Sequence, residues 1–196
     1  MPLREELRFG DTSYVMEVLG IRCRPLTEHD IEEIVGRKLE VEGREGVAIS
    51  LIDPRFVVGR RHLLAGVYMA LKSYVKGRTF ARRLDVEIML YMACTKEINK
   101  AYGIVGLKKG IDSLLMVLIR EGGKGGSILD VARDILGDRI VKVDDEVMDF
   151  SEEKAKIVVK AFNITPDEMK ISKMEGEEGF LHAILSRMAL LNIFKR

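Results

Sequence analysis

Apolar positions along this chain alternate between strand-like and helix-like spacing. Residues 13–23 and 47–52 are rich in β-branched side chains and bounded by Gly, Asp or Pro, which predicts two strands. Between them Thr27 can cap a helix over residues 28–39, because its hydroxyl can accept from the amide of residue 30. The apolar stripe of that helix would be Ile31, Ile34, Val35 and Leu39. The pattern therefore predicts a strand, a helix and a strand.

Three successive helices are predicted next, over residues 60–75, 85–92 and about 95–105. The first would bury Leu64, Val67, Leu71 and Tyr74, and the third would bury Ile98, Ala101, Tyr102 and Val105. The middle segment fits a helix or a strand by periodicity, and its Met and Leu content favours a helix.

The last third of the chain returns to strands before it ends in helices. Residues 114–119 read as a buried strand, Ser127 can cap a helix to about residue 136, and residues 139–143 read as a strand. Helices are predicted over 151–162 and 179–194. This order predicts a helix-rich α/β (α+β) fold, in which a small mixed β-sheet is packed by helices.

Length and composition indicate one compact domain spanning residues 1–196. The chain is 47% hydrophobic and 32% charged, which is typical of a folded soluble protein. It has no apolar run long enough to cross a membrane and no secretory signal, so we expect a cytoplasmic protein. Cys23 and Cys94 are predicted to be reduced thiols, and the three scattered histidines predict no metal site.

A block of positive charge is hidden in this nearly neutral chain. Residues 54–84 contain eight basic residues and no acidic one, whereas the formal net charge of the whole chain is +1. Such a block is typical of a surface that binds phosphates. The alternative is a solvated helix face whose acidic neighbours come from elsewhere in the fold.

Aromatic residues interleave with these cations, as they do in proteins that hold unpaired nucleotides. Phe56 and Phe80 are expected to be more accessible than Tyr68 and Tyr74, which should face the core at least partly. The start of the 60–75 helix and the loop over 76–83 are the best candidates for RNA contact. The predicted RNA-binding residues are Arg60, Arg61, His62, Lys76, Arg78, Phe80, Arg82 and Arg83.

The sequence signals for nucleotide binding, a reactive cysteine or an acid/base pair are weaker. The glycine-rich turn 122–127 could cradle a nucleotide, but Lys124 and Ser127 are separated by two glycines, unlike a Walker loop. Cys94 precedes a predicted helix, yet it lies among apolar residues and is more typical of a core cysteine. The carboxylates of residues 144–153 are more typical of a solvated loop and helix start than of an acid/base pair.

The last helix has more apolar positions than one buried stripe needs. It is either a central helix buried on most sides or a surface that binds another protein. The candidate partner-binding residues are Leu181, Ile184, Leu185, Met188, Leu191 and Phe194.

Several segments of the chain, in this order and spacing, resemble the TPRKB-type small subunits of the KEOPS tRNA-modification complex, especially the archaeal ones. These segments are residues 59–71, 84–93, 97–107, 114–119 and 181–190. Two features depart from the family pattern: Lys96-Glu97-Ile98 stands where the family tends to have Arg-Gln-Ile, and the glycine-rich 122–126 turn is particular to this chain.

The resemblance implies a non-enzymatic, regulatory subunit without cofactor or metal. Its partners would be the Bud-type kinase/ATPase of the complex and a tRNA, engaged at the single-stranded CCA end for threonylcarbamoyl-adenosine modification. Two alternatives remain: a small nucleotide-binding enzyme that uses the 122–127 turn, and a purely structural adaptor whose basic block pairs with an acidic protein.

Overall fold

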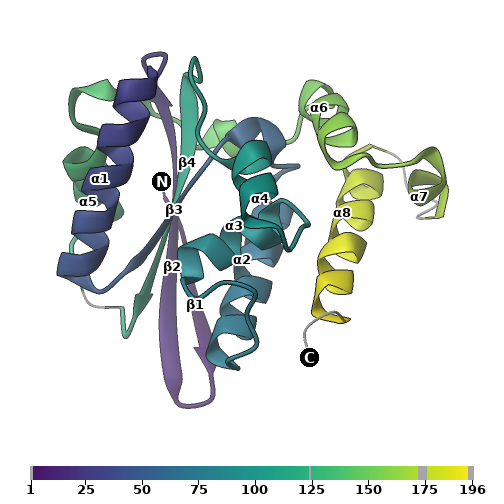
Figure 1. The fold of residues 1–196 in the computed structure, drawn as a ribbon, viewed down its shortest axis with the longest axis horizontal. Coiled ribbons are helices and arrows are strands. Elements are labelled where there is room, and N and C mark those ends of the chain that lie inside the picture. Colours follow the sequence, from purple (N-terminus) through teal and green to yellow (C-terminus); the bar gives the residue numbers. More distant parts are fainter. Residues whose placement is uncertain (1, 124, 172–175, 194–196) are drawn as a thin grey trace. The chain divides into compact units, whose positions relative to one another are not determined.

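The computed structural model describes residues 2–123, 125–171 and 176–193, except for the side chains of residues 170 and 171. The chain forms two compact units (Figure 1). Unit 1 consists of Met1–Asp53 and Leu107–Val147, and unit 2 consists of Pro54–Gly106 and Met148–Arg196. The assignment of residues 1–196 to a single domain stays a prediction.

Unit 1 is a five-stranded sheet with two helices packed on it. Its strands follow the order β1-β2-β4-β3, and β5 also pairs with β2. Helices α1 and α5 lie side by side against the sheet (Figure 1), and their apolar side chains form one core with alternate residues of β2, β3 and β4. The elements are β1 (Leu3–Phe9), β2 (Thr12–Cys23), α1 (Glu28–Glu45), β3 (Ala48–Ile52), β4 (Ser113–Glu121), α5 (Ile128–Leu136), a 3₁₀ turn (Gly137–Arg139) and β5 (Ile140–Val143).

Every strand pairing in the described residues is antiparallel, so the prediction of a mixed sheet was wrong in that detail. The strand-helix-strand unit formed by β2, α1 and β3 is present, and it would make a parallel pair if its strands were neighbours. Instead β4 lies between β2 and β3 and runs antiparallel to both. The separation of the two parallel strands explains the all-antiparallel sheet.

Strand β1 was not predicted from the sequence. Arg4, Glu5, Glu6 and Arg8 dominate it, and all four are exposed; within the described residues β1 pairs only with β2, so it is an edge strand. Charged side chains are common on edge strands, where they discourage pairing with other chains. The two-residue turn to β2 contains Gly10, whose φ of 61° suits a tight hairpin.

Unit 2 is helical. The predicted helix over 60–75 is confirmed, the 85–92 segment is a helix as favoured, and α7 was not predicted. The elements are a 3₁₀ turn (Pro54–Phe56), α2 (Arg60–Val75), α3 (Leu84–Met92), α4 (Ile98–Val105), α6 (Glu152–Phe162), α7 (Pro166–Ile171) and α8 (Gly176–Ile193). Before α6, a further 3₁₀ turn (Asp145–Met148) carries the chain from unit 1 into unit 2. Together the two units confirm the helix-rich α+β class.

The core of unit 2 is built around α3, eight of whose nine residues are buried. Helix α2 turns Leu63, Val67, Ala70 and Leu71 inward, so its buried stripe is rotated from the one predicted. Tyr74 belonged to the predicted stripe and is 41% exposed. In α4 only the small Ala101 and Val105 are buried, as required by its close contact with α3.

Candidate functional site: a basic pocket at the end of helix α2

The arginines at the start of α2 are neutralised by carboxylates from the second half of unit 2. Arg60 Nε lies 3.0 Å from Asp149 Oδ1, and Arg61 pairs with Glu178. Gly59, the residue before the helix, has φ 82°, and a Cβ there would come within 2.6 Å of Glu177 Oε1. For these two arginines the structure favours the alternative to a phosphate site, a solvated helix face, because their acidic partners come from distant parts of the sequence.

His62 was predicted to contact RNA, and the structure contradicts this. Its side chain is fully buried, with a relative exposure of 0%, and Nδ1 accepts a hydrogen bond of 3.1 Å from the amide of Val58. Burial lowers the pKa of His62 to about 4, so the ring is neutral at physiological pH. His62 stabilises the turn before α2 and presents nothing to a ligand in solvent.

Two carboxylates of α3 hold the loop that follows α2. Glu87 is buried, and its Oε2 accepts from the backbone amides of Phe80 and Ala81, each at 3.0 Å. Arg83 donates to both carboxylate oxygens of Asp85, at 2.9 and 3.0 Å. The loop is therefore fixed on α3, Phe80 is half-buried, and the charge of Arg83 is paired.

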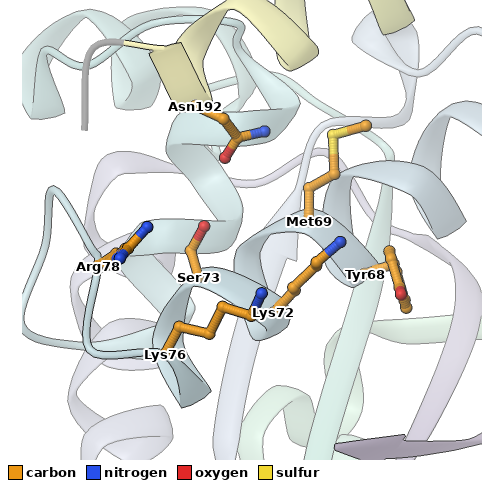
Figure 2. A pocket seen from close by; sticks show the side chains of 7 residues that line it. All are labelled: Tyr68, Met69, Lys72, Ser73, Lys76, Arg78 and Asn192. Atoms are coloured by element: carbon orange, nitrogen blue, oxygen red, sulfur yellow. The ribbon is translucent and has the colours of Figure 1, made fainter. Parts of the chain in front are cut away.

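Three of the remaining cations of the basic block, Lys72, Lys76 and Arg78, meet at a pocket of about 330 Å³ at the C-terminal end of α2 (Figure 2). No acidic side chain is among its described lining residues, and the described residues contain no ion pair to Lys72, Lys76 or Arg78. The lining residues are Tyr68, Met69, Lys72, Ser73, Lys76, Arg78 and Asn192. Of the eight predicted RNA-binding residues, the structure brings Lys76 and Arg78 together here, while Arg82 is exposed outside the lining.

An aromatic ring lies beside these cations, but it is not one of the two that were expected. Tyr68 is 43% exposed, and Lys72 Nζ lies 5.8 Å from the centre of its ring. Phe56 and Phe80 are only partly exposed, so the expected order of accessibility was wrong. The spacing of Tyr68, Lys72 and Lys76 at i, i+4 and i+8 places them on one helix face, which was the available sequence signal.

Helix α8 buries most of the residues that were predicted to bind a protein. Leu181, Ile184, Met188 and Leu191 are buried in unit 2, and Leu185 is half-buried; Phe194 lies outside the described residues. The reading of a central helix therefore holds for these positions. The large apolar side chains that are exposed in the described part of α8 are Leu190 at 52% and Ile193 at 70%.

The glycine-rich turn has a structural explanation in its contact with Arg120. A Cβ at Gly125, where φ is 145°, would lie 2.8 Å from Arg120 Nε, and one at Gly123 would meet Val15. The Arg120 guanidinium is buried and pairs with Glu17 at 2.7 Å, with Glu45 further away at 3.8 Å. Two carboxylates around one arginine oppose a bound polyphosphate; Lys124 lies outside the described residues.

The cysteines and the acidic run, which were the other candidate reactive groups, also have structural explanations. Both cysteines are free, and burial raises the pKa of Cys23 to about 11 and that of Cys94 to about 12, so neither is a ready thiolate. In the acidic run, Asp144 pairs with Arg22 and Lys142. The described residues contain no group of three or more His, Cys, Asp or Glu placed to hold a metal ion. In the same part of the chain, no helix has the length and apolarity needed to cross a membrane.

The family model for the kinase binding protein CGI-121 matches residues 30–192, which include the basic pocket. The chain belongs to the CGI-121 family. This confirms the resemblance to TPRKB-type subunits, and the match extends over α1, the sheet strands after it and unit 2 up to Asn192.

A zebrafish relative of this CGI-121 family chain is also known. The chain is 27% identical over 159 residues to the Danio rerio protein "EKC/KEOPS complex subunit TPRKB". The similarity covers 80% of this chain and 83% of the zebrafish protein. It therefore spans both units of the CGI-121 fold rather than one motif.

Proposed function

We propose that this chain is a non-catalytic, regulatory subunit of a KEOPS-type complex, of the archaeal kind, acting in the cytoplasm as one domain over residues 1–196. It binds the Bud-type kinase/ATPase of that complex and recruits tRNA by its unpaired CCA end for threonylcarbamoyl-adenosine modification. The description of the CGI-121 family as a kinase binding protein supports the kinase partner, and the name of the zebrafish relative supports the KEOPS complex.

The observation that carries tRNA recruitment is the basic pocket in unit 2. Lys72, Lys76 and Arg78 surround it, and its described lining residues include no carboxylate, so their charge is available to phosphates. Tyr68 offers an exposed ring of the kind on which unpaired bases stack. This combination fits single-stranded RNA better than duplex RNA, whose bases are already stacked on one another.

The RNA proposal is tested by a triple variant, Lys72→Gln with Lys76→Gln and Arg78→Gln, in a filter-binding titration against tRNA. Loss of three phosphate contacts should reduce the slope of log K against log salt by about 2, since each contact to a single strand contributes about 0.7. Between 50 and 200 mM salt the wild type should then lose roughly 20-fold more affinity than the variant.

The matched control is Arg60→Gln with Arg61→Gln, because these arginines belong to the same helix but are paired with Asp149 and Glu178. It should leave the salt slope nearly unchanged. Equal slopes in the wild type and the triple variant would remove the pocket from the RNA site. A triple variant that keeps tRNA and loses an acidic protein partner would favour the structural adaptor.

For the kinase surface we propose the exposed face of α8 that carries Leu190 and Ile193. Leu190→Asp with Ile193→Asp should abolish co-purification of the kinase subunit, because an interface core excludes charge. Val35→Asp with Leu39→Asp on α1 is the control, since these side chains are similarly exposed at 43% and 45%. Retention of the kinase by the α8 variant would place the interface elsewhere.

A further inference from the structure

The pocket at the end of α2 contains one neutral side chain whose orientation is fixed by a buried partner. Asn192 enters the pocket from α8, and the hydroxyl of Tyr91 donates to its Oδ1. Tyr91 is fully buried in α3, and its Oη also lies 2.8 Å from Ser73 Oγ. Ser73 is itself buried. The amide of Asn192 is therefore linked to two buried hydroxyls.

The protons of this relay determine which end of the amide faces a ligand. A tyrosine hydroxyl has one proton, and Tyr91 donates it to Asn192, so Ser73 must be the donor in its contact with Tyr91. The amide oxygen of Asn192 is thereby held toward Tyr91. Figure 2 shows that oxygen on the side of Ser73 and the amide nitrogen turned away from it. Asn192 thus offers two N–H donors.

The other polar groups of the pocket are mainly donors as well. Lys72, Lys76 and Arg78 have no acceptor atoms in their side chains, so a ligand must bring acceptors to all of them. Phosphate oxygens satisfy cations, whereas a neutral amide is suited to a carbonyl oxygen on a base edge. The volume of about 330 Å³ is at the small end of ligand pockets and suits a single nucleotide.

We infer that Asn192, held in place by Tyr91, is a specificity-determining residue that selects a base with a carbonyl oxygen in this pocket. The inference rests on the proposed RNA function and adds to it the chemistry of the base. Tyr91 is a positioning residue, because it acts through Asn192. Without the Tyr91 hydroxyl the amide group of Asn192 can rotate by half a turn, and Asn192 then offers an acceptor as readily as a donor.

The test uses RNA hexamers with five abasic positions and one central base, either hypoxanthine or adenine, and fluorescence anisotropy as the readout. These two bases differ at C6, where hypoxanthine has a carbonyl and adenine an amine, and at N1, which carries a proton in hypoxanthine and accepts in adenine. One hydrogen bond gives an expected preference of about fivefold for hypoxanthine in the wild type. A hexamer with all six positions abasic reports the phosphate contacts alone.

Three variants separate orientation from folding. Tyr91→Phe should bring the preference close to one and leave binding of the fully abasic hexamer unchanged. Ser73→Ala, the matched control, should keep the preference, since Tyr91 can still donate to Asn192. Asn192→Asp lies at an exposed position and presents acceptors only, so it should bind more weakly and prefer adenine.

The outcomes distinguish this inference from the proposed function. If no hexamer or tRNA binds the wild type, this inference and the proposed recruitment of tRNA are both overturned. If RNA binds but the wild type shows no preference, or Tyr91→Phe keeps it, only the role of Asn192 and Tyr91 is overturned. Equal loss of preference in Ser73→Ala and Tyr91→Phe would also overturn the role of Asn192 and Tyr91, because such a result would indicate a general disturbance of the pocket. If Tyr91→Phe fails to fold, Asn192→Asp decides by the direction of its preference.

Discussion

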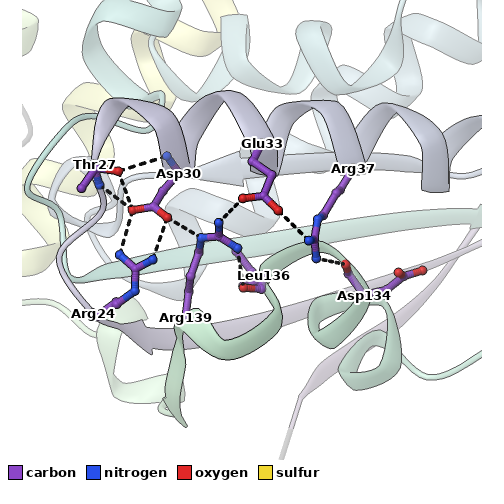
Figure 3. Close-up of polar contacts among 8 residues, drawn as sticks. All are labelled: Arg24, Thr27, Asp30, Glu33, Arg37, Asp134, Leu136 and Arg139. Atoms are coloured by element: carbon purple, nitrogen blue, oxygen red, sulfur yellow. Dashed lines mark hydrogen bonds and ion pairs between the residues drawn. The ribbon is translucent and has the colours of Figure 1, made fainter.

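Two groups of cations, one in each unit of this chain, have opposite surroundings. In unit 1, Arg24, Arg37 and Arg139 surround Asp30 and Glu33 (Figure 3). Arg139 Nε donates to Asp30 at 2.7 Å, and Arg24 donates to both oxygens of Asp30 at 2.8 and 2.7 Å. In unit 2, the described lining of the pocket contains cations without a carboxylate.

The difference shows that local carboxylates decide what a cation does. In the unit 1 cluster each acceptor oxygen of Asp30 already has donors, and Arg139 also bonds the carbonyl of Leu136 at 3.3 Å, which ties the end of α5 to α1. Such groups hold elements together and have little capacity left for a ligand. The pocket cations keep that capacity. Three variants, taken in order of decreasing expected effect, break or sharpen this contrast.

The largest effect is expected from Arg139→Met, which removes the buried centre of the unit 1 cluster. Asp30 would keep only Arg24 as a cationic partner, and the variant should lose about 3 kcal/mol of stability, near the lower end for a broken buried pair. Urea denaturation measures this. Lys76→Met in the pocket is the control and should change stability by less than about 0.5 kcal/mol. Similar losses in both variants would contradict the contrast.

A smaller effect is expected in the pH dependence of stability. The hydrogen bonds from Arg24, and then those from Thr27 and Arg139, hold the pKa of Asp30 well below its usual range. A pKa that is lower in the folded state stabilises the fold fully above the unfolded pKa of about 3.9, and this stabilisation is lost as the pH falls below it.

Asp30→Asn should therefore be less stable than the wild type at pH 7 and should lose less stability between pH 5 and pH 3. Urea midpoints at pH 7, 5, 4 and 3 measure the two profiles, with Lys76→Met expected to follow the wild type. Parallel profiles for Asp30→Asn and the wild type would show that Asp30 does not carry this linkage.

Local patterns were sufficient to predict most elements of the fold from the sequence. Thr27 caps α1 and Ser127 caps α5 as predicted, because a cap depends on a few neighbouring residues. Strand order could not be predicted, since β4 enters between β2 and β3 from more than 60 residues away in the chain. Helix α1 was predicted to end at residue 39 and extends to Glu45. It ends there because Gly46 adopts the left-handed conformation, at φ 65°, that caps a helix C-terminus.

The candidate site was predictable in its charge and not in its geometry. Lys76 and Arg78 were identified from a block without acidic residues, but the same block contains Arg60 and Arg61, whose partners Asp149 and Glu178 lie about 90 and 117 residues away. His62 has a side chain suited to RNA contact, and the apolar residues of α8 are suited to a protein interface. Only the packing shows that most of them are buried. Asn192 carried no signal, because its role depends on the buried hydroxyl of Tyr91.

The smallest effect is expected when a carboxylate is added to the pocket, whose described lining contains none. Met69→Glu places an acid three residues before Lys72 on α2, and such a pair stabilises a helix by about 0.2–0.5 kcal/mol. RNA affinity should fall at the same time, because the new charge competes with phosphates for Lys72.

Met69→Gln is the matched control, since it has the same shape without the charge and removes the same apolar contacts. The difference between the two variants, in urea denaturation and in RNA binding, should disappear at 1 M salt, where charges are screened beyond about 3 Å. A stable Met69→Glu protein that binds RNA as well as Met69→Gln would show that the cations of this pocket do not face the phosphates.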